Sequence, residues 1–169
     1  ELSELARSRG LALGVNHNHR FHPTFLRLEE RLAAGEIGRL EHVQATWSMP
    51  LGQLDAGRLD DWMLRAPRNI VFEQGPHPLS QVHALCGPVI EGEAGPLEAR
   101  ELAPGQVFHP RWSGALRGEE ATAEISLGFG QDFECSRLVA IGTDGSLEAD
   151  FIHGALTCER KSAWLPFWN

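Results

Sequence analysis

The sequence predicts a fold of mixed helices and strands, in which helices prevail early and the second half of the chain is all-β. Apolar residues recur at helical spacing over residues 23–35 and 79–86, as in helices with one buried face. From Pro88 onward, apolar and polar residues alternate instead, most regularly over residues 121–129, as in strands with one wet face. The length of 169 residues is enough for one domain with a hydrophobic core.

The first predicted element is a helix over residues 1–9, with Leu2 and Leu5 on one side and Gly10 at its end. Residues 11–15 follow as a short, mostly buried strand. A helix, a glycine and an apolar strand in this order form the closing unit of many doubly wound α/β domains. Because the chain opens inside such a unit without an initiator Met, we expect it to begin in mid-structure.

A second helix and a long strand come next. Pro23 is placed to start the helix and Gly35 to end it, and the apolar face between them holds Phe25, Leu28 and Leu32. The strand after it alternates apolar with polar residues: Val43, Ala45 and Trp47 against His42, Gln44, Thr46 and Ser48. Residues 50–68 are expected to form a loop with a short helix around residues 59–64.

The second half ends in a predicted hairpin. Residues 138–141 form an apolar strand, and Thr143-Asp144-Gly145 is a favourable hairpin turn. On the return strand, the apolar residues point one way: Leu147, Ala149 and Phe151.

Composition excludes several classes of protein. The net charge of −8 argues against binding to nucleic acid or to an anionic membrane surface, and no apolar stretch approaches the roughly 20 residues of a membrane span. The three cysteines, Cys86, Cys135 and Cys158, are widely spaced, as expected of free thiols in a reducing cytosol. There is no Tyr, and Lys161 is the single lysine. Proton transfer therefore falls to His, Asp or Glu, or to residues outside this chain.

Residues 69–87 hold the strongest candidate for chemistry. Gly75 allows a sharp turn, and Pro76 suits the first turn of a helix that Gly87 ends. His77 is thus expected at a loop-to-helix junction, four residues after Glu73. A helix N-terminus disfavours a second proton on the imidazole and a nearby carboxylate favours it, which suits a group that exchanges protons near neutrality. The alternative is a histidine that only caps the helix, and on spacing alone it is the commoner case.

Other histidines support a competing hypothesis. The spacing of His17, His19 and His22 can bring imidazoles together, as in a metal-dependent hydrolase or lyase. No acidic residue is spaced as a nearby ligand, so we rank this hypothesis lower. His83 is predicted to be a core histidine, on the apolar face of its helix.

Four motifs, in order, resemble the back half of an oxidoreductase of the Gfo/Idh/MocA family, the relatives of glucose–fructose oxidoreductase and inositol dehydrogenase. They are Asn18-x-Arg20-Phe21-x-Pro23, Gly35-Glu36-Ile37-Gly38, Glu73-x-Gly75-x-His77 and the hairpin Ile141–Leu147. The sequence departs from the family at Glu73, where the family has Asp, at Ser80, where it often has Asp, and at Arg68-Asn69-Ile70, where it usually has a Gly-rich run.

The resemblance implies an α+β domain built on a large, mostly antiparallel β-sheet with helices on one face. Residues 1–16 would be the last helix and strand of a truncated NAD(P)-binding Rossmann domain. Residues 17–169 would be the substrate-binding and catalytic domain, cut short at its C-terminus. NAD or NADP would be bound mainly by the missing domain, in agreement with the absence of a G-x-G-x-x-G motif here.

The resemblance also assigns roles. His77 would be the acid–base residue that exchanges the hydroxyl proton of a sugar or cyclitol-like substrate, with Glu73 orienting or charge-balancing its ring. Asn18 and Arg20, on the junction loop, would meet the cofactor or the substrate, with a hydrogen bond between the loop and the domain as an equally good alternative. Trp62 and Arg65 would line the substrate pocket, although an ordinary partly buried residue is the better interpretation of Trp62. No metal is implied.

A third hypothesis is a non-catalytic dimerisation or binding module. The family often makes its subunit contact through the sheet, which predicts a homo-oligomer. Its contact residues would be Val43, Ala45, Ile125 and Leu127.

Overall fold

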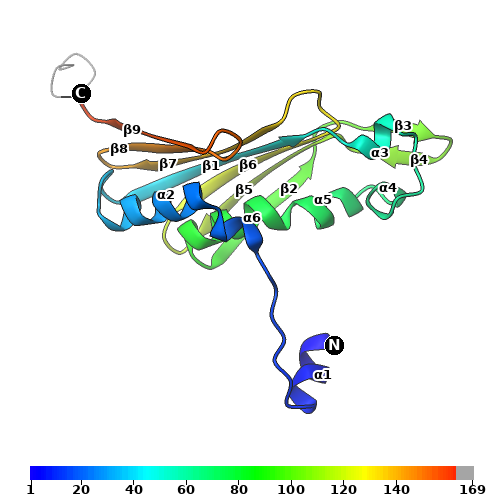
Figure 1. The fold of residues 1–169 in the computed structure, drawn as a ribbon, viewed down its shortest axis with the longest axis horizontal. Helices are drawn as coiled ribbons and strands as arrows, with labels where there is room; N and C mark the ends of the chain where they lie inside the picture. The colour runs from blue at the N-terminus through cyan, green and yellow to red at the C-terminus, as the bar shows by residue number, and fades with distance from the viewer. Residues whose placement is uncertain (163–169) are drawn as a thin grey trace.

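A seven-stranded sheet forms the body of the protein in the computed structural model, which describes residues 1–162 (Figure 1). The strand order is β2-β5-β6-β1-β7-β8-β9, and only the pairing of β1 with β6 is parallel. The strands are β1 (Leu40–Met49), β2 (Val89–Pro96), β5 (Arg111–Gly118), β6 (Thr122–Phe129), β7 (Cys135–Gly142), β8 (Gly145–Asp150) and β9 (Ala155–Arg160). The predicted large, mostly antiparallel sheet is therefore confirmed.

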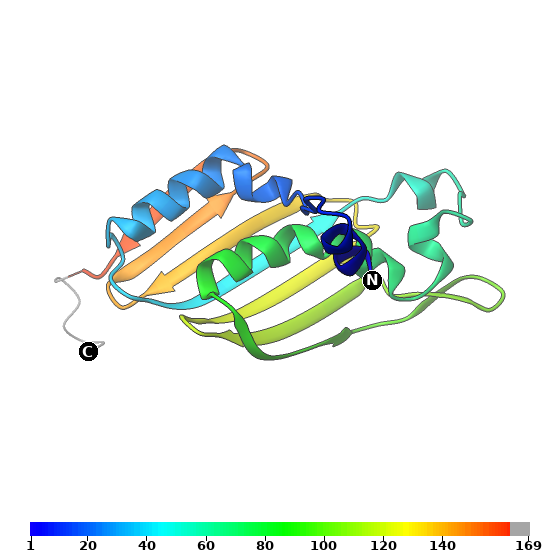
Figure 2. The ribbon, with the colours of Figure 1, turned by 90° about the horizontal axis from the view of Figure 1, so that it is seen from below.

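Two long helices cover one face of this sheet (Figure 2). Helix α2 (Pro23–Ala33) lies over β8 and β9, and α6 (Pro76–Cys86) lies over β1, β6 and β5. Both begin at a proline and end next to a glycine with positive φ, Gly35 and Gly87, as the sequence predicts.

The core lies between the helices and the sheet. Alternate strand residues face the helices and are buried, and Phe25 and Leu28 of α2 pack on them. The residues proposed above as a dimer contact, Val43, Ala45, Ile125 and Leu127, belong to this core and are at most 7% exposed. The prediction that these residues form the dimer contact is wrong. The side chains of a strand alternate between its two faces, and here the apolar face packs against the helices of the same chain. The opposite face carries polar residues such as Gln44 and Glu124.

Short elements are gathered at one end of the sheet, namely α3 (Gly52–Asp55), α4 (Trp62–Arg65), α5 (Asn69–Gln74), β3 (Arg100–Ala103) and β4 (Gln106–Phe108). The short helix expected around residues 59–64 is α4, which starts later. The apolar run at residues 70–72 belongs to α5, where Ile70 is fully buried and Phe72 is 64% exposed. Successive helical residues point in different directions, so only part of this run reaches the core.

The N-terminal segment stands clear of the sheet (Figure 1). Helix α1 (Leu2–Ser8) forms as predicted, but none of its residues is buried. The strand predicted over residues 11–15 is wrong: the segment is extended without strand pairing, and Leu11, Leu13 and Val15 are exposed. A strand needs a partner for its main-chain groups, and none lies beside this segment within residues 1–162.

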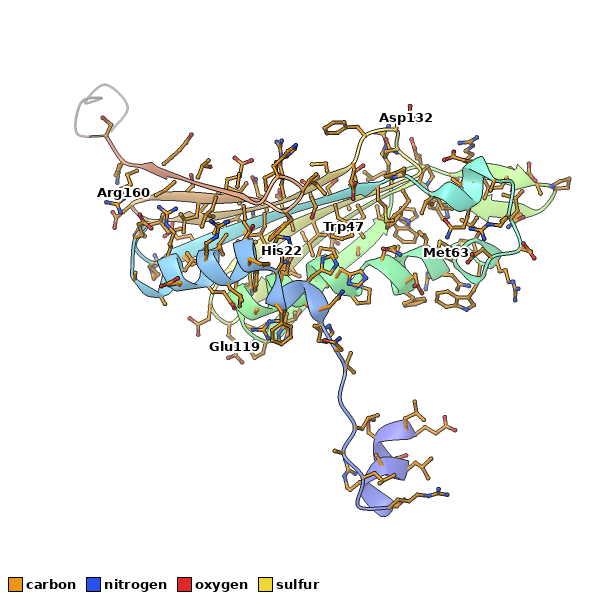
Figure 3. All side chains as sticks on the ribbon, in the orientation of Figure 1. His22, Trp47, Met63, Glu119, Asp132 and Arg160 are labelled. Atoms are coloured by element: carbon orange, nitrogen blue, oxygen red, sulfur yellow. The ribbon has the colours of Figure 1, made fainter. Side chains whose placement is uncertain are left out.

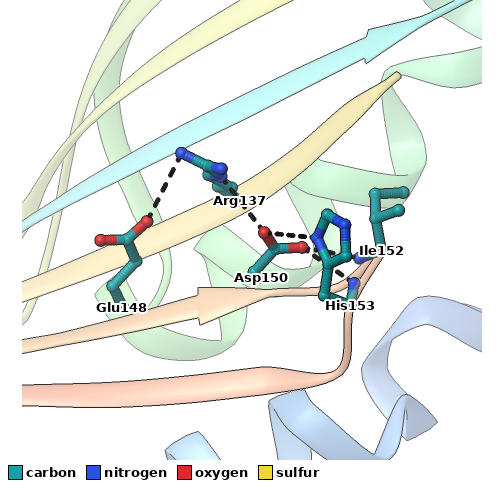
Figure 4. Close-up of polar contacts among 5 residues, drawn as sticks. All are labelled: Arg137, Glu148, Asp150, Ile152 and His153. Carbon is teal, nitrogen blue, oxygen red and sulfur yellow. Dashed lines mark hydrogen bonds and ion pairs between the residues drawn. The ribbon is translucent and has the colours of Figure 1, made fainter. Parts of the chain in front are cut away.

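The turn between β8 and β9 is held by Asp150 (Figure 4). Its carboxylate accepts hydrogen bonds of 3.0 Å from the main-chain N–H groups of Ile152 and His153, and it lies 3.0 Å from Nδ1 of His153. These bonds lower the pKa of Asp150, and Arg137 Nε lies 3.4 Å from the same carboxylate. The turn thereby fixes Phe151, whose ring contacts the His22 ring edge-on with centroids 5.3 Å apart.

The cysteines Cys86, Cys135 and Cys158 are free. Among residues 1–162, no helix combines the length and the apolar character that a membrane crossing requires.

Candidate functional site

Three elements meet around His77. They are the start of α6, the single-turn 3-10 helix η1 (Asn18–Phe21) and the second half of β1. His77 is the second residue of α6 and is half-buried. It follows a short helix, α5, so it lies at a helix-to-helix junction and not at the predicted loop-to-helix junction.

Gly75 makes this junction, for a different reason from the one expected. Its φ is −59°, which any residue can adopt. A Cβ at this position, however, would lie 2.5 Å from the main-chain oxygen of Val71. The clash is with the last turn of α5 itself, because Val71 lies four residues before Gly75 and its main-chain oxygen accepts the Gly75 N–H at 2.8 Å. A glycine is therefore needed where α5 ends, directly before the helix that carries His77.

Three aromatic rings form the site, which we call the ring cluster: His19, Trp47 and His77. The centroids of His19 and His77 are 4.3 Å apart, those of His19 and Trp47 are 4.9 Å apart, and those of Trp47 and His77 are 5.8 Å apart. The planes of Trp47 and His77 are within 24° of parallel. Trp47 belongs to β1, and Figure 3 labels it between the sheet and the helical layer, near the middle of the sheet. The cluster thus joins η1, the sheet and α6.

Two buried polar side chains of α6 hold the backbone around the cluster. Gln81, only 3% exposed, donates from Nε2 to the main-chain oxygen of His19 at 3.0 Å. Ser80 donates from Oγ to the main-chain oxygen of His77 at 2.8 Å. Because residues three and four positions apart share one side of a helix, Ser80 and Gln81 lie on the side of α6 that carries His77.

The environment keeps His19 uncharged. Burial, and then the nearby His77 and His22, lower the pKa of His19 to about 4. The indole Nε1 of Trp47 is buried and has no hydrogen-bond partner among the residues described. Buried donors of this kind are uncommon in folded proteins, so the cluster combines an uncharged imidazole with an unused hydrogen-bond donor.

Glu73 does not contact His77. Its side chain is exposed near the end of α5, and within residues 1–162 no hydrogen bond or ion pair joins it to the imidazole. The helix breaks at Gly75, so the four-residue spacing does not place the two side chains one above the other as it would on a continuous helix. The role of Glu73 stays a prediction.

The predicted cofactor residues lie beside the cluster. Asn18 and Arg20 flank His19 on η1, and both are exposed. Arg20 forms a long ion pair with Glu29 of α2, 3.5 Å between Nη2 and Oε1. Most of its donors, and the amide of Asn18, therefore remain accessible.

The predicted substrate residues lie elsewhere. Trp62 and Arg65 belong to α4, and α5 separates that helix from α6 (Figure 1). Trp62 is 49% exposed, and Nε of Arg65 donates to the main-chain oxygen of Asp60 at 2.6 Å. Neither residue reaches the ring cluster in the chain as described.

The histidines of the metal hypothesis do not converge. Nδ1 of His22 accepts a hydrogen bond from the main-chain N–H of Thr24 and so caps α2, while His19 faces Trp47. Across residues 1–162, no group of three or more His, Cys, Asp or Glu side chains could hold a metal ion. The prediction for His83 is also wrong, because its side chain is exposed.

Sequence reasoning missed Trp47 and Gln81 as parts of the site. Both had a usable signal. Trp47 shares the apolar side of its strand with Val43 and Ala45, which places it under the helices, and Gln81 is four residues after His77 on a helix. Their convergence on His19 depends on tertiary structure.

Comparisons with known proteins agree with this architecture. The sequence matches the family model described as GFO/IDH/MocA C-terminal domain over residues 25–148. No curated protein sequence matches the chain.

Solved structures with the same fold include a putative oxidoreductase from Magnetospirillum magnetotacticum (TM-score 0.70, 20% identity, 99% of this chain and 50% of that one). An inositol dehydrogenase homolog complexed with NAD+ from Azotobacter vinelandii has a TM-score of 0.72 at 15% identity, over 96% of this chain and 47% of that one. A UDP-N-acetylglucosamine 3-dehydrogenase from Acidithiobacillus ferrooxidans has a TM-score of 0.66 at 19% identity, over 95% of this chain and 48% of that one. The chain thus spans about half the length of these proteins.

Proposed function

Because the chain belongs to the GFO/IDH/MocA family through its C-terminal domain, we propose that it supplies the acid–base residue and the substrate-facing surface of a nicotinamide-dependent oxidoreductase. The reaction is the transfer of hydride between the nicotinamide and a carbon that bears a hydroxyl group. This chain contributes the movement of the hydroxyl proton, and the residues before it contribute most of the dinucleotide site.

The observation that carries the proposal is the position of His77. It is half-buried at the first turn of α6 and lies against η1, the turn from which residues 11–17 extend away from the helical layer (Figure 1). A nucleotide-binding domain attached through that segment would face the same end of α6. When hydride leaves the carbon, the hydroxyl loses its proton, and a neutral imidazole can accept it. In the reverse direction the imidazolium returns that proton.

The residues on η1 fit a dinucleotide cofactor. Asn18 offers an exposed amide, and Arg20 offers donors that its long ion pair with Glu29 leaves accessible, which is suitable chemistry for the anionic and carbonyl groups of NAD or NADP. When bound, the cofactor exchanges the hydride. Asn18 and Arg20 would orient it next to His77, and exposed Glu73 would balance the charge of a protonated ring.

We propose a sugar or cyclitol as the substrate. The structural relatives named as an inositol dehydrogenase homolog and a UDP-N-acetylglucosamine 3-dehydrogenase support this class. Trp62 and Arg65 could contribute only if the substrate or the preceding domain extends toward α4.

We also propose a homo-oligomer in the cytoplasm. Within the part of the chain described, no long helix covers the polar face of the sheet (Figure 1), which is the surface available to a second copy. Three free thiols suit a reducing compartment. Light scattering on the chain tests the assembly, and a mass near 18.6 kDa would argue against it.

The acid–base assignment is tested by His77→Ala in the full-length protein that contains this sequence. NADH formation is followed at 340 nm with myo-inositol as the first probe of a polyol panel, and with NAD+ and NADP+ in parallel. We expect turnover to fall about 10²–10⁴-fold. His83→Ala is the matched control, since His83 is an exposed histidine of the same helix, and it should keep full turnover. A loss below about tenfold in His77→Ala would remove the acid–base role.

A further inference from the structure

We propose that His19 is a positioning residue for His77: its ring, backed by Trp47, fixes the plane in which the His77 imidazole exchanges protons. The inference rests on the proposed function, because it concerns how the acid–base residue is held. It assigns a task to the ring cluster that the motif residues alone do not supply.

Among the residues that the structure describes, His77 has no polar partner that fixes the orientation of its ring. A catalytic imidazole is commonly fixed by a hydrogen bond from one ring nitrogen to a carboxylate or carbonyl. Within residues 1–162, no hydrogen bond to the His77 ring is present, and exposed Glu73 does not supply one. Only the main-chain oxygen of His77 is bonded, by Ser80. The orientation of the ring therefore depends on packing.

The packing of the three rings defines a plane for the His77 imidazole. The His19 and His77 rings are inclined by 31° with centroids 4.3 Å apart, and Trp47 lies within 5.8 Å of His77 and nearly parallel to it. Aromatic rings at such separations attract each other in preferred offset arrangements. Stacking acts on the ring plane and leaves the ring edge, where both nitrogens lie, free for a substrate.

The main chain of His19 is itself firmly held. Its main-chain oxygen accepts from buried Gln81 at 3.0 Å and from the N–H of His22 at 3.2 Å. The next residue, Arg20, bonds back to the main-chain oxygen of His17 at 3.0 Å. Trp47 projects from β1, which has a paired strand on each side. The support therefore consists of a tethered turn and a central strand.

The charge state of His19 also suits a residue that positions His77 and does not itself exchange protons. The titratable groups that face His19 are His77 from α6 and His22 from its own turn, while Trp47 carries no charge. Burial and these two imidazoles lower the pKa of His19 to about 4, so the ring is neutral at pH 7. Two imidazolium rings at this separation would repel each other. A neutral His19 lets His77 take up a proton without that opposition.

The experiment compares His19→Ala, His19→Phe and the control His83→Ala in the full-length protein. The first readout is the order parameter of the His77 ring from ¹³C relaxation at Cε1–H, measured without cofactor or substrate. The second is kcat and KM with NAD+ and myo-inositol as the probe. Phenylalanine keeps a ring to stack but has no nitrogen to titrate, so it separates packing from proton exchange.

We expect His19→Ala to lower the His77 order parameter below about 0.6. In the same variant kcat should fall about 10–100-fold while KM changes little, since misplacement acts on the reacting geometry. His19→Phe should restore a rigid ring and most of the lost turnover. An unchanged His77 ring in His19→Ala, or equal impairment of the Phe and Ala variants, would overturn the inference. Full activity of His77→Ala would instead sink the proposed function, so the two failures are distinguishable.

Discussion

Replacing Gln81 by Met tests how the η1 turn is attached to α6. Methionine has a similar length and fills the same space, but it removes the 3.0 Å hydrogen bond from Nε2 to the main-chain oxygen of His19. A net hydrogen bond contributes about 0.5–1.5 kcal/mol. The main-chain oxygen of His19 keeps the 3.2 Å bond from the N–H of His22 in this variant, so it is not left without a partner. Because His19 is only half-buried, water can replace part of the lost bond.

We therefore expect a cost of about 1 kcal/mol, confined to the attachment of the turn. This corresponds to about fivefold faster amide exchange at Arg20 and His22, whose N–H groups close the turn. Hydrogen exchange followed by NMR measures the effect residue by residue. Gln44→Met is the matched control, since Gln44 is exposed on the polar side of β1, and it should leave these amides unchanged. If exchange at Arg20 and His22 is the same in both variants, Gln81 does not hold the turn and the argument from burial fails.

Two further predictions concern stability. Arg31 and Arg160 hydrogen-bond Glu36 and lower its pKa from 4.5 to about 2; since the folded pKa is the lower one, this stabilisation is complete above pH 4.5 and is lost as pH falls toward 2. Urea unfolding should show that loss. Glu36→Gln should weaken the dependence of the free energy of unfolding on pH in that window and leave the part that Asp150 and Glu91 contribute, since their pKa values are lowered as well. An identical dependence in the variant would contradict the assignment. A Cβ at Gly118 would lie 2.1 Å from the main-chain oxygen of Cys86, at the end of α6, so Gly118→Ala should lower the free energy of unfolding by about 1–3 kcal/mol. Gly95→Ala is the control: Gly95 has open space around it, and the substitution should cost less than about 1 kcal/mol. Equal costs for the two variants would show that the contact at Gly118 can relax.

Local pattern was a good guide wherever one face of an element is covered. The alternation over residues 121–129 marks β6 because its apolar half lies under α6. Pro23 and Gly35 bracket α2 because proline and positive-φ glycine have defined places at helix ends. The Thr143-Asp144-Gly145 turn connects β7 and β8 as expected, with Gly142 paired to Gly145.

The sequence pattern was a poor guide where the structure of a segment depends on the segments that pair with it. Residues 11–15 are apolar enough for a strand, but within residues 1–162 nothing pairs with them. Strand β2 gave no signal, because it lies at the edge of the sheet and its side chains are mostly exposed. The candidate site divides in the same way: His77 could be chosen from its motif, whereas its contacts with His19 and Trp47 join residues far apart in the chain.

The position of β1 has a consequence for how the protein is made. Its neighbours in the sheet, β6 and β7, both come later in the chain, and His42 pairs with Thr122, 80 residues further on. During synthesis β1 therefore leaves the ribosome with both edges unpaired, and they stay unpaired until β6 and β7 have been synthesised. Such late pairing slows folding and leaves edges open to other chains. A nascent chain stalled before residue 120 should for this reason bind chaperones and aggregate, whereas one whose residues up to 142 have emerged can pair both edges of β1.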